Sequence, residues 1–289
     1  MNIHLIDGTY ELFRAHFGAP PKKSASGQEV GATLGLMRSL LMLLQSPGVT
    51  HVGVAFDHVI ESFRNKMYAG YKTGAGVDPV LMAQFPLAEQ AVSALGVVVW
   101  PMVEFEADDA LASATAKFKK NKSVEQILIC SPDKDLTQLV QGKRIVCWDR
   151  RREIIMDEKG VVEKFGVKPE SIPDYLALVG DSADGYPGIK GWGAASTSAV
   201  LAKYKHIESI PKDPKKLGLG LGRATTLLEN LQKNHADALL FRELSTLRKD
   251  VPLKENLSDL KWQGAYPRLK KFCHELGEER IVERVIKWR

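Results

Sequence analysis

Cysteine and histidine are scarce in this sequence. Its 289 residues include three cysteines, an odd number without a C-x-x-C pair, and seven histidines that are scattered without the spacing of metal ligands. A disulfide framework and a zinc site are therefore both disfavoured. The low cysteine content is also typical of proteins that fold in a reducing cytoplasm.

Long apolar segments are absent as well. Residues 1–7 lack a cationic start followed by a long apolar run, so we expect no signal peptide. The longest apolar stretch, residues 34–44, is interrupted by Arg38 and Ser39 and is not expected to cross a membrane. These absences predict a cytoplasmic protein with no membrane partner, and we also expect a monomer.

Several common catalytic motifs are missing. The sequence contains no G-x-S-x-G motif, no P-loop and no H-E-x-x-H motif. A glycine-rich stretch at residues 218–222 follows Lys215 and Lys216 and not a strand, which indicates a loop and not a dinucleotide site. Chemistry that depends on these motifs is therefore disfavoured.

Basic residues outnumber acidic ones by a small margin, 40 to 35, which gives a net charge of +5. Such an excess can serve solubility alone, and a solvated surface is the simpler interpretation of any single basic cluster. Clusters of lysine and arginine also release counterions from a polyanion, so together they suit a nucleic-acid partner. The clusters are Lys117, Lys119, Lys120 and Lys122; Arg150 to Arg152; and Lys203, Lys205, Lys212, Lys215, Lys216 and Arg223.

Short β-rich runs alternate with helical patterns in the first half of the chain. This alternation predicts βαβ units, hence an α/β fold with a mostly parallel sheet covered by helices. After about residue 165 only helical patterns remain, so we expect an α/β domain over residues 1–170 and a helical region over 171–289. The polar stretch 61–79 suits an exposed or mobile segment. The predicted strands are 3–6, 52–56, 97–100, 127–130 and 145–147, and the predicted helices are 31–44, 86–95, 107–118, 171–179, 194–203, 223–232, 236–247, 266–276 and 278–287.

Carboxylates follow the predicted strands. Ligands of open α/β sheets bind at the carboxyl ends of the strands, so these acids are expected to converge. An aspartate after a strand also caps the next helix, and capping explains any one of them equally well. Adjacent acids need a further explanation, because one carboxylate is enough for a cap and several in one cleft repel each other. The acids are Asp7, Asp57, Glu106, Asp108, Asp109, Asp133 and Asp135, with Asp181 and Asp184 later.

A cation resolves that repulsion. The candidate ligands are all carboxylates, and hard oxygen ligands suit Mg²⁺ or Mn²⁺ and disfavour zinc. Two such ions activate a water and stabilise the leaving oxygen when a phosphodiester is displaced in line. The residues alone therefore predict metal-assisted phosphodiester chemistry.

A glycine-rich turn lies between two predicted helices at residues 188–193. Glycines let backbone N–H groups approach a phosphate closely, and the following helix presents its positive end. A tight turn that needs glycine only for its dihedral angles is the alternative. The turn predicts a helix–hairpin–helix that grips a DNA backbone without reading its sequence.

Six motifs in this order resemble the 5′-3′ exonuclease/flap endonuclease family, with spacing similar to the 5′-nuclease domain of bacterial DNA polymerase I. The resemblance covers residue 3 to roughly residue 250. The chain ends at Arg289, so we expect a nuclease that stands alone, with no polymerase after it. The motifs are Leu5–Gly8, Val54–Asp57, Phe63-Arg64 with Tyr71-Lys72, Glu106–Asp109, Asp133–Leu136 and Gly180–Asp184.

The resemblance implies a PIN-like (resolvase-like) fold followed by a helical region with a helix–hairpin–helix (H3TH) motif. It implies that the nine acids named above hold two Mg²⁺ ions, for which Mn²⁺ substitutes, and that the hairpin holds K⁺. Arg64 and Lys72 would be the catalytic residues, reaching the scissile phosphate from a helical arch. Expected substrates are DNA with a 5′ flap, nick or gap, and RNA–DNA hybrids. The implied DNA-binding residues are Arg14, Tyr71, Gly188, Lys190, Gly191 and Gly193.

Some positions depart from the family pattern. After Tyr71-Lys72 the family continues with asparagine and arginine, whereas this chain has Thr73 and Gly74, which removes a basic arch contact. Two other functions stay open: a PIN-like endoribonuclease, which would not need the hairpin, and a DNA-junction binding protein without catalysis.

Overall fold

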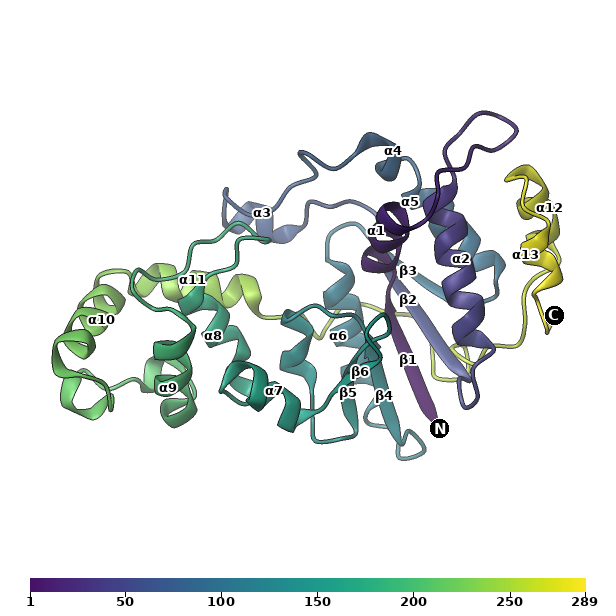
Figure 1. Ribbon diagram of the computed structural model, residues 1–289. Helices are drawn as coiled ribbons and strands as arrows, with labels where there is room; N and C mark the ends of the chain where they lie inside the picture. The colour runs from purple at the N-terminus through teal and green to yellow at the C-terminus, as the bar shows by residue number, and fades with distance from the viewer. The chain divides into compact units, whose positions relative to one another are not determined.

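β-Branched and aliphatic residues form the strands that the sequence predicts. In the computed structural model, which describes residues 1–289, four of them pair in parallel in the order β3-β2-β1-β4 (Figure 1). The central strand β1 is buried along nearly its whole length, as expected of a strand covered on both faces. These strands are β1 (Asn2–Asp7), β2 (His51–Asp57), β3 (Val98–Met102) and β4 (Gln126–Cys130).

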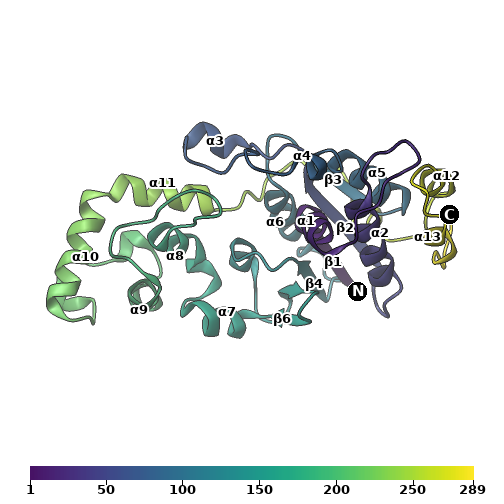
Figure 2. The ribbon, with the colours of Figure 1, turned by 45° about the horizontal axis from the view of Figure 1, so that its top comes forward.

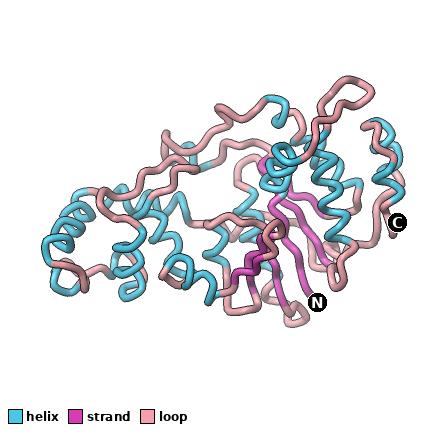
Figure 3. The backbone as a smooth tube through the Cα atoms, viewed as in Figure 1, coloured by secondary structure: helices cyan, strands magenta, loops and turns pink.

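The chain divides into two compact units, each discontinuous in sequence. Unit 1 comprises residues 1–62, 74–131 and 248–289, and unit 2 comprises residues 63–73 and 132–247. These units cut across the predicted division at residue 170, because segments distant in sequence pack together. The last strand, β6, nevertheless ends before that residue, and only helices and loops follow it (Figure 3).

Unit 1 has helices on both faces of its parallel sheet. Right-handed crossovers place α1, α2 and α5 on one face, because they connect β1 to β2 and β2 to β3 in one direction across the sheet. The connection from β3 to β4 runs back past β1, so α6 covers the other face. The helices are α1 (Gly8–Gly18), α2 (Gly31–Leu44), α4 (Pro79–Met82), α5 (Phe85–Ala94), α6 (Ala107–Phe118), α12 (Arg268–Glu275) and α13 (Arg280–Glu283).

The end of the chain departs from the predicted helix over 278–287. Helix α13 stops at Glu283, and Trp288 near the end of the chain forms an isolated backbone bridge with Ala265. The N–H groups of Ala265 and Arg289 donate to the carbonyls of Lys287 and Ala265, both at 2.9 Å. Backbone pairing therefore replaces the last helical turns.

Unit 2 is mainly helical, and α8 lies beside α11 in both ribbon views (Figures 1 and 2). Its core includes the Tyr186 ring, which stacks on Phe241 at 5.5 Å between centroids. The unit contains α3 (Phe63–Met67), η1 (Asp135–Leu139), β5 (Ile145–Asp149), β6 (Ile154–Met156), α7 (Glu158–Phe165), η2 (Pro169–Ser171), α8 (Ile172–Val179), α9 (Ala194–Tyr204), η3 (Ile207–Ser209), η4 (Pro214–Lys216), α10 (Leu221–Lys233) and α11 (His235–Ser245). Strands β5 and β6 form an antiparallel hairpin.

Residues 61–79, predicted as an exposed or mobile segment, include many exposed side chains, but part of the segment is packed into the fold. Residues 63–73 are part of unit 2, and the ring of Tyr68 meets Phe241 edge-on at 5.6 Å. Arg64 and Tyr71 are buried there. The stretch is mainly charged and polar, so its sequence does not indicate that these side chains are buried. No helix of the chain has both the length and the apolar surface to cross a membrane.

Candidate functional site

Two carboxylates end neighbouring parallel strands of unit 1. Asp7 is the last residue of β1 and lies opposite Ala55 of β2, while Asp57 is the last residue of β2. Ser131 follows β4 on the other side of β1, and its hydroxyl donates a 2.9 Å hydrogen bond to Asp7 Oδ2. Asp7 therefore lies where the strand order reverses between β1 and β4, which is the usual ligand position of an open α/β sheet.

Each of these strand-end acids also accepts a hydrogen bond that fixes local structure. Asp7 Oδ1 accepts one from the N–H of Tyr10 at 2.8 Å and caps α1. Asp57 Oδ1 accepts one from the N–H of Ala107 at 2.7 Å. Capping of the next helix is thus confirmed for Asp7, whereas Asp57 holds the start of α6, which is not the next helix along the chain. Each carboxylate therefore has a structural role. It does not exclude metal ligation, because an ionised carboxylate has about four acceptor sites. Their role as metal ligands stays a prediction.

The acidic stretch at the start of α6 separates into different roles. Glu106 and Asp109 form a reciprocal capping box in which Asp109 Oδ2 accepts from the N–H of Glu106 at 3.0 Å. The other oxygen of Asp109 accepts from the N–H of Arg248 at 2.9 Å, and the residue is fully buried. Backbone N–H groups thus engage both oxygens of Asp109, which favours a structural role, and its role as a metal ligand stays a prediction. Asp108 is partly exposed, and Glu106 also accepts from the Ser62 hydroxyl at 2.7 Å.

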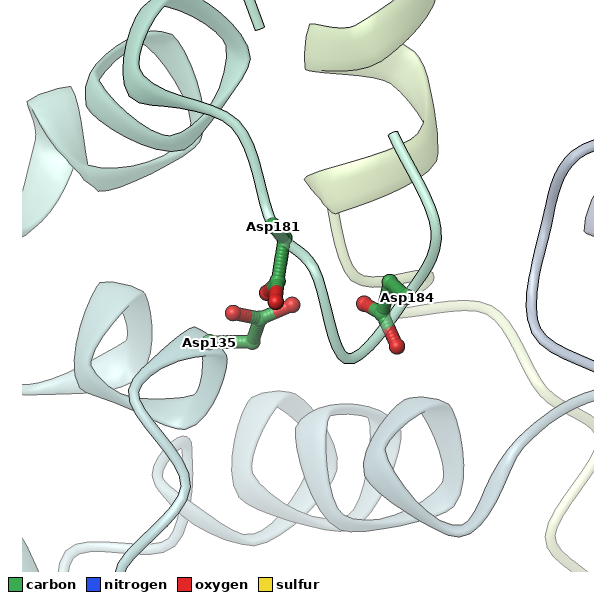
Figure 4. Close-up of side chains that lie close together, drawn as sticks. All are labelled: Asp135, Asp181 and Asp184. Atoms are coloured by element: carbon green, nitrogen blue, oxygen red, sulfur yellow. The ribbon is translucent and has the colours of Figure 1, made fainter. Parts of the chain in front are cut away.

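Three carboxylates of unit 2 come together in a buried group, which we call the acidic cluster: Asp135, Asp181 and Asp184. Each offers an oxygen within 4.8 Å of the others. Asp135 begins η1, whereas Asp181 and Asp184 lie on the turn that follows α8, and the carboxylates of Asp135 and Asp181 face each other (Figure 4). All three residues are at most 8% exposed. The sequence predicted all three as ligands, and the fold brings them together although Asp135 and Asp184 are 49 positions apart.

The electrostatics of the acidic cluster call for a cation. Burial, followed by the neighbouring negative charges, raises the pKa of the Asp135 carboxyl well above its ordinary value of 3.8. Its Oδ1 is buried and accepts no hydrogen bond from the protein. A buried carboxylate oxygen without a donor is costly unless a cation or proton reaches it. The residues therefore fit a hard divalent ion, which prefers oxygen ligands.

Lysines pair with two members of the cluster. Lys134 Nζ lies 2.6 Å from Asp181 Oδ2, and Lys72 Nζ lies 3.1 Å from Asp184 Oδ1. Burial lowers the pKa of the Lys134 ammonium, but its hydrogen bond to Asp181 and the nearby carboxylates raise that pKa by more. Asp133 is exposed, and its Oδ1 accepts from the N–H of Asp135 at 2.8 Å, so it shapes the turn before η1. Its predicted ligand role is not tested by this contact.

The side chains of Arg64 and Tyr71, both predicted to contact DNA, are buried in this structure. The Arg64 side chain is buried, and its Nε donates to the Leu244 carbonyl at 2.7 Å while Nη2 donates to the Thr246 carbonyl at 3.2 Å. These carbonyls lie at the end of α11, where a cation satisfies backbone acceptors. Tyr71 is only 3% exposed. Both side chains pack inside unit 2 here, and their roles in contacting DNA stay predictions.

Arg14 on α1 is held by two residues that sequence analysis did not single out. Its Nη2 pairs with the buried carboxylate of Glu11 and donates to the Ser39 hydroxyl at 2.9 Å. The Ser39 hydroxyl in turn donates to Glu11 at 3.0 Å. The i,i+3 spacing of Glu11 and Arg14 on a helix was the available signal. Nothing local in sequence indicated Ser39, which comes from α2.

The glycines of the hairpin in unit 2 meet requirements of the protein's own backbone, as the tight-turn alternative expects. Gly188 has φ +71°, and a Cβ there would lie 2.4 Å from the Gly180 nitrogen, so glycine is required. Gly191 also has positive φ, at +87°. Gly193 has open space beyond its Cα and directly precedes α9. Lys190, Gly191 and Gly193 are exposed.

This arrangement leaves the start of α9 open to an anion. No side chain caps α9 at Gly193, and the first residues of that helix, Ala194 and Ala195, are small and exposed. The hairpin is held against α10, because the Trp192 indole N–H donates to the Leu227 carbonyl at 3.0 Å. Backbone N–H groups at such a helix start bind phosphate. DNA binding by the hairpin, and a K⁺ ion within it, stay predictions.

Comparison with known proteins identifies matches along most of the chain. The family described as 5′-3′ exonuclease, N-terminal resolvase-like domain, matches residues 2–166. The family described as 5′-3′ exonuclease, C-terminal SAM fold, matches residues 167–268. These matches confirm the predicted resolvase-like fold followed by a helical region.

Individual relatives agree with the family matches. A 5′-3′ exonuclease of Aquifex aeolicus is 32% identical over 286 residues, which cover 99% of this chain and 95% of the relative. DNA polymerase I of Mycobacterium leprae is 31% identical over 265 residues, which cover 90% of this chain but only 28% of the polymerase. A bacteriophage T5 flap endonuclease, solved in a pseudo-enzyme-product complex with DNA and metal ions, has a TM-score of 0.68 at 15% identity, covering 98% of this chain and 96% of that one. At this identity the structural likeness shows the fold alone.

Proposed function

The chain belongs to the 5′-3′ exonuclease family, and on this premise we propose that it is a Mg²⁺-dependent nuclease that cuts branched or nicked DNA near a 5′ end. The observation that carries the metal dependence is the acidic cluster, three buried carboxylates with an Asp135 oxygen that no protein donor reaches. Burying such carboxylates away from water is unfavourable unless a cation offsets their charge. The cluster therefore supports a metal site and not only a structural network.

The residues of the acidic cluster are suited to hold a divalent ion. Asp135, Asp181 and Asp184 supply only carboxylate oxygens, the ligand type that Mg²⁺ and Mn²⁺ prefer. A bound ion of this kind lowers the pKa of its water and stabilises negative charge on a phosphodiester. We assign a second ion to Asp7, Asp57, Glu106 and Asp108 of unit 1, on the support of the strand ends that carry them.

Other residues of the chain bind and orient the substrate in this proposal. Lys72 supplies a positive charge to the scissile phosphate, and the third of its side chain that is exposed leaves its ammonium within reach. The hairpin at Gly188–Gly193 and the start of α9 hold the backbone of duplex DNA through N–H groups. Arg14, fixed by Glu11 and Ser39, is a further phosphate contact.

The proposed substrates are DNA with a 5′ flap, nick or gap, and RNA primers hybridised to DNA. Contacts to backbone phosphates position a substrate without reading its bases, so selection is by structure and not by sequence. The basic clusters supply much of the affinity, which makes binding fall steeply as salt rises. We propose that the chain acts as a monomer.

A cleavage panel tests this function. Labelled flap, nick, gap and RNA–DNA substrates are incubated with and without Mg²⁺, using wild type and Asp135→Asn. We expect Asp135→Asn to reduce cleavage by at least about 100-fold, the scale on which loss of an electrostatic stabiliser acts, while DNA binding survives. The matched control is Asp157→Asn, since an asparagine there still accepts the 3.0 Å bond from the Gly160 N–H that caps α7.

Each other result points to a different function. Cleavage that persists in Asp135→Asn contradicts the assignment of the metal to the acidic cluster. Preference for single-stranded RNA over a flap duplex identifies an endoribonuclease. Binding to junction DNA without cleavage at any Mg²⁺ concentration identifies a binding protein.

A further inference from the structure

We propose that Lys134 and Lys72 are built-in counterions of the acidic cluster, which hold it together before a divalent ion binds and oppose the binding of that ion. The inference rests on the proposed function, because it assumes that the ion binds at this cluster. It assigns to Lys134 a role that is separate from contact with DNA.

Lys134 is fixed in place by its position in the chain. It lies between Asp133 and Asp135 in the turn that leads into η1, and its ammonium reaches Asp181 at 2.6 Å. The second oxygen of Asp181 accepts from the N–H of Ala183 at 3.0 Å. Both oxygens of Asp181 are thus engaged by protein donors, so an ion that takes this carboxylate as a ligand competes with the ammonium of Lys134.

Lys72 is fixed by its backbone as well as by its side chain. Its N–H donates to the Asp184 carbonyl at 3.0 Å, and its ammonium lies 3.1 Å from the carboxylate of the same residue. Gly185, which follows Asp184 in the chain, has φ +87°, and a Cβ there would lie 2.1 Å from the Gly70 carbonyl oxygen. This close backbone contact keeps Lys72 beside Asp184.

Charge balance explains why both lysines matter. Three buried carboxylates in contact repel each other, and two ammonium groups offset two of the three negative charges. The same ammonium groups repel a divalent cation that approaches the shared oxygens. The cluster therefore has two states in which two of its three negative charges are offset, one by the lysines and one by the ion. When the ion takes Asp184, Lys72 loses its partner and becomes available for a phosphate, so ion binding and phosphate contact are coupled.

Lys134 provides the cleaner test, since Lys72 is assigned to substrate binding. Mn²⁺ alone is titrated into wild type, Lys134→Met, Lys134→Arg and Asp135→Asn without DNA, by calorimetry and by the electron paramagnetic resonance signal of free Mn²⁺. Thermal unfolding in EDTA is measured in parallel. The matched control is Lys159→Met, which removes a lysine from an exposed i,i+4 pair with Glu163 at 3.4 Å in the same unit.

We expect Lys134→Met to bind Mn²⁺ at least about fivefold more tightly than wild type, because the competing ammonium is absent. Its melting temperature in EDTA should fall, since one counterion of the cluster is missing. Lys134→Arg, which keeps the charge, should stay near wild type in both measurements. Lys159→Met should change neither. Lys134→Gln carries the same expectations if the methionine variant does not fold.

The outcomes separate the two proposals. Mn²⁺ affinity that Asp135→Asn weakens but Lys134→Met leaves unchanged overturns the counterion role and leaves the metal site standing. Equal gains in affinity for Lys134→Met and Lys134→Arg also overturn it, because the effect then comes from packing and not from charge. Absence of Mn²⁺ binding in wild type, or binding that Asp135→Asn does not alter, overturns the metal site itself and the counterion role with it.

Discussion

The carboxylate of Asp57, the last residue of β2, accepts a 2.7 Å hydrogen bond from the N–H of Ala107, the first residue of α6. One oxygen of a predicted metal ligand therefore also holds the start of a helix that follows a different strand. Asp7 has the same double character, because it caps α1 and lies at the reversal of strand order. Substitutions that separate charge from hydrogen bonding are needed to distinguish these roles.

Asp57→Asn and Asp57→Ala make this separation. Asparagine keeps an acceptor for the Ala107 N–H but removes the charge, so we expect near wild-type stability with cleavage reduced by at least about 100-fold. Alanine removes both and should in addition lower the free energy of unfolding by about 1 kcal/mol. Urea denaturation and flap cleavage, measured on the same preparations, check the pair. Full activity in Asp57→Asn would leave Asp57 as a cap alone.

Asp108 and Asp109 are adjacent, yet we expect opposite results from their asparagine variants. In Asp109→Asn the side-chain NH2 group replaces one of the carboxylate oxygens, each of which accepts a hydrogen bond from a backbone N–H. Two donors then face each other, which costs about 1–3 kcal/mol of stability. Its folded fraction should cleave at a rate within a few-fold of wild type. Asp108→Asn should keep stability and lose cleavage. Guanidinium denaturation with single-turnover kinetics measures both, and a stable but inactive Asp109→Asn would contradict the structural role.

The hairpin glycines should also differ from each other. Gly188→Ala places a side chain at φ +71° and against the Gly180 backbone, so it should lower stability by about 1–3 kcal/mol. Gly193→Ala meets open space and should fold normally. Its methyl group lies where we expect a phosphate to approach, so affinity for duplex DNA should fall. Fluorescence anisotropy with labelled duplex checks the affinity, and unchanged binding would remove Gly193 from the DNA surface.

The raised pKa of Asp135 predicts a pH effect on the stability of the metal-free protein. The folded state binds the proton more tightly than the unfolded state, so the free energy of unfolding falls as pH rises from the ordinary value of 3.8 through the folded pKa. Asp135→Asn carries no such charge. In EDTA it should therefore exceed wild type in stability at neutral pH, and the difference should vanish below about pH 4.

Chemical denaturation of wild type and Asp135→Asn across this pH range measures the effect. Saturating Mg²⁺ should reverse the order at neutral pH, because an ion that binds only the folded wild type adds to its stability. A constant difference between the two proteins from pH 4 to pH 8 would show that the Asp135 charge is compensated without an ion.

Much of the fold was open to prediction from local patterns. Each strand predicted in the first half is present, and the helix predicted over 107–118 matches α6 at both ends. Hydrophobic periodicity is a local property, so it survives in the sequence whatever the tertiary context. The pattern did not indicate β6, whose three residues are largely exposed and so lack the buried face that marks a strand.

For the functional residues, too, local features could be predicted and contacts between distant segments could not. Sequence determined that acids follow the strands and placed Asp135, Asp181 and Asp184 among nine candidate ligands, since carboxylates near strand ends and turns are visible in the sequence itself. It did not determine that Asp109 turns both oxygens to backbone N–H groups or that Arg64 caps α11, because these partners, Arg248 and Leu244, are distant in sequence.

The sequence by itself determined the order of the elements, the types of ligand and the glycines of the hairpin, since each depends on a residue's own chemistry or its near neighbours. Only the tertiary structure decided which acids are buried together and which lysines neutralise them. That choice depends on burial and on charges brought together from distant segments, as Lys134 and Asp181 show at 2.6 Å. Electrostatic energy depends on distance in space, and distance along the chain does not report it.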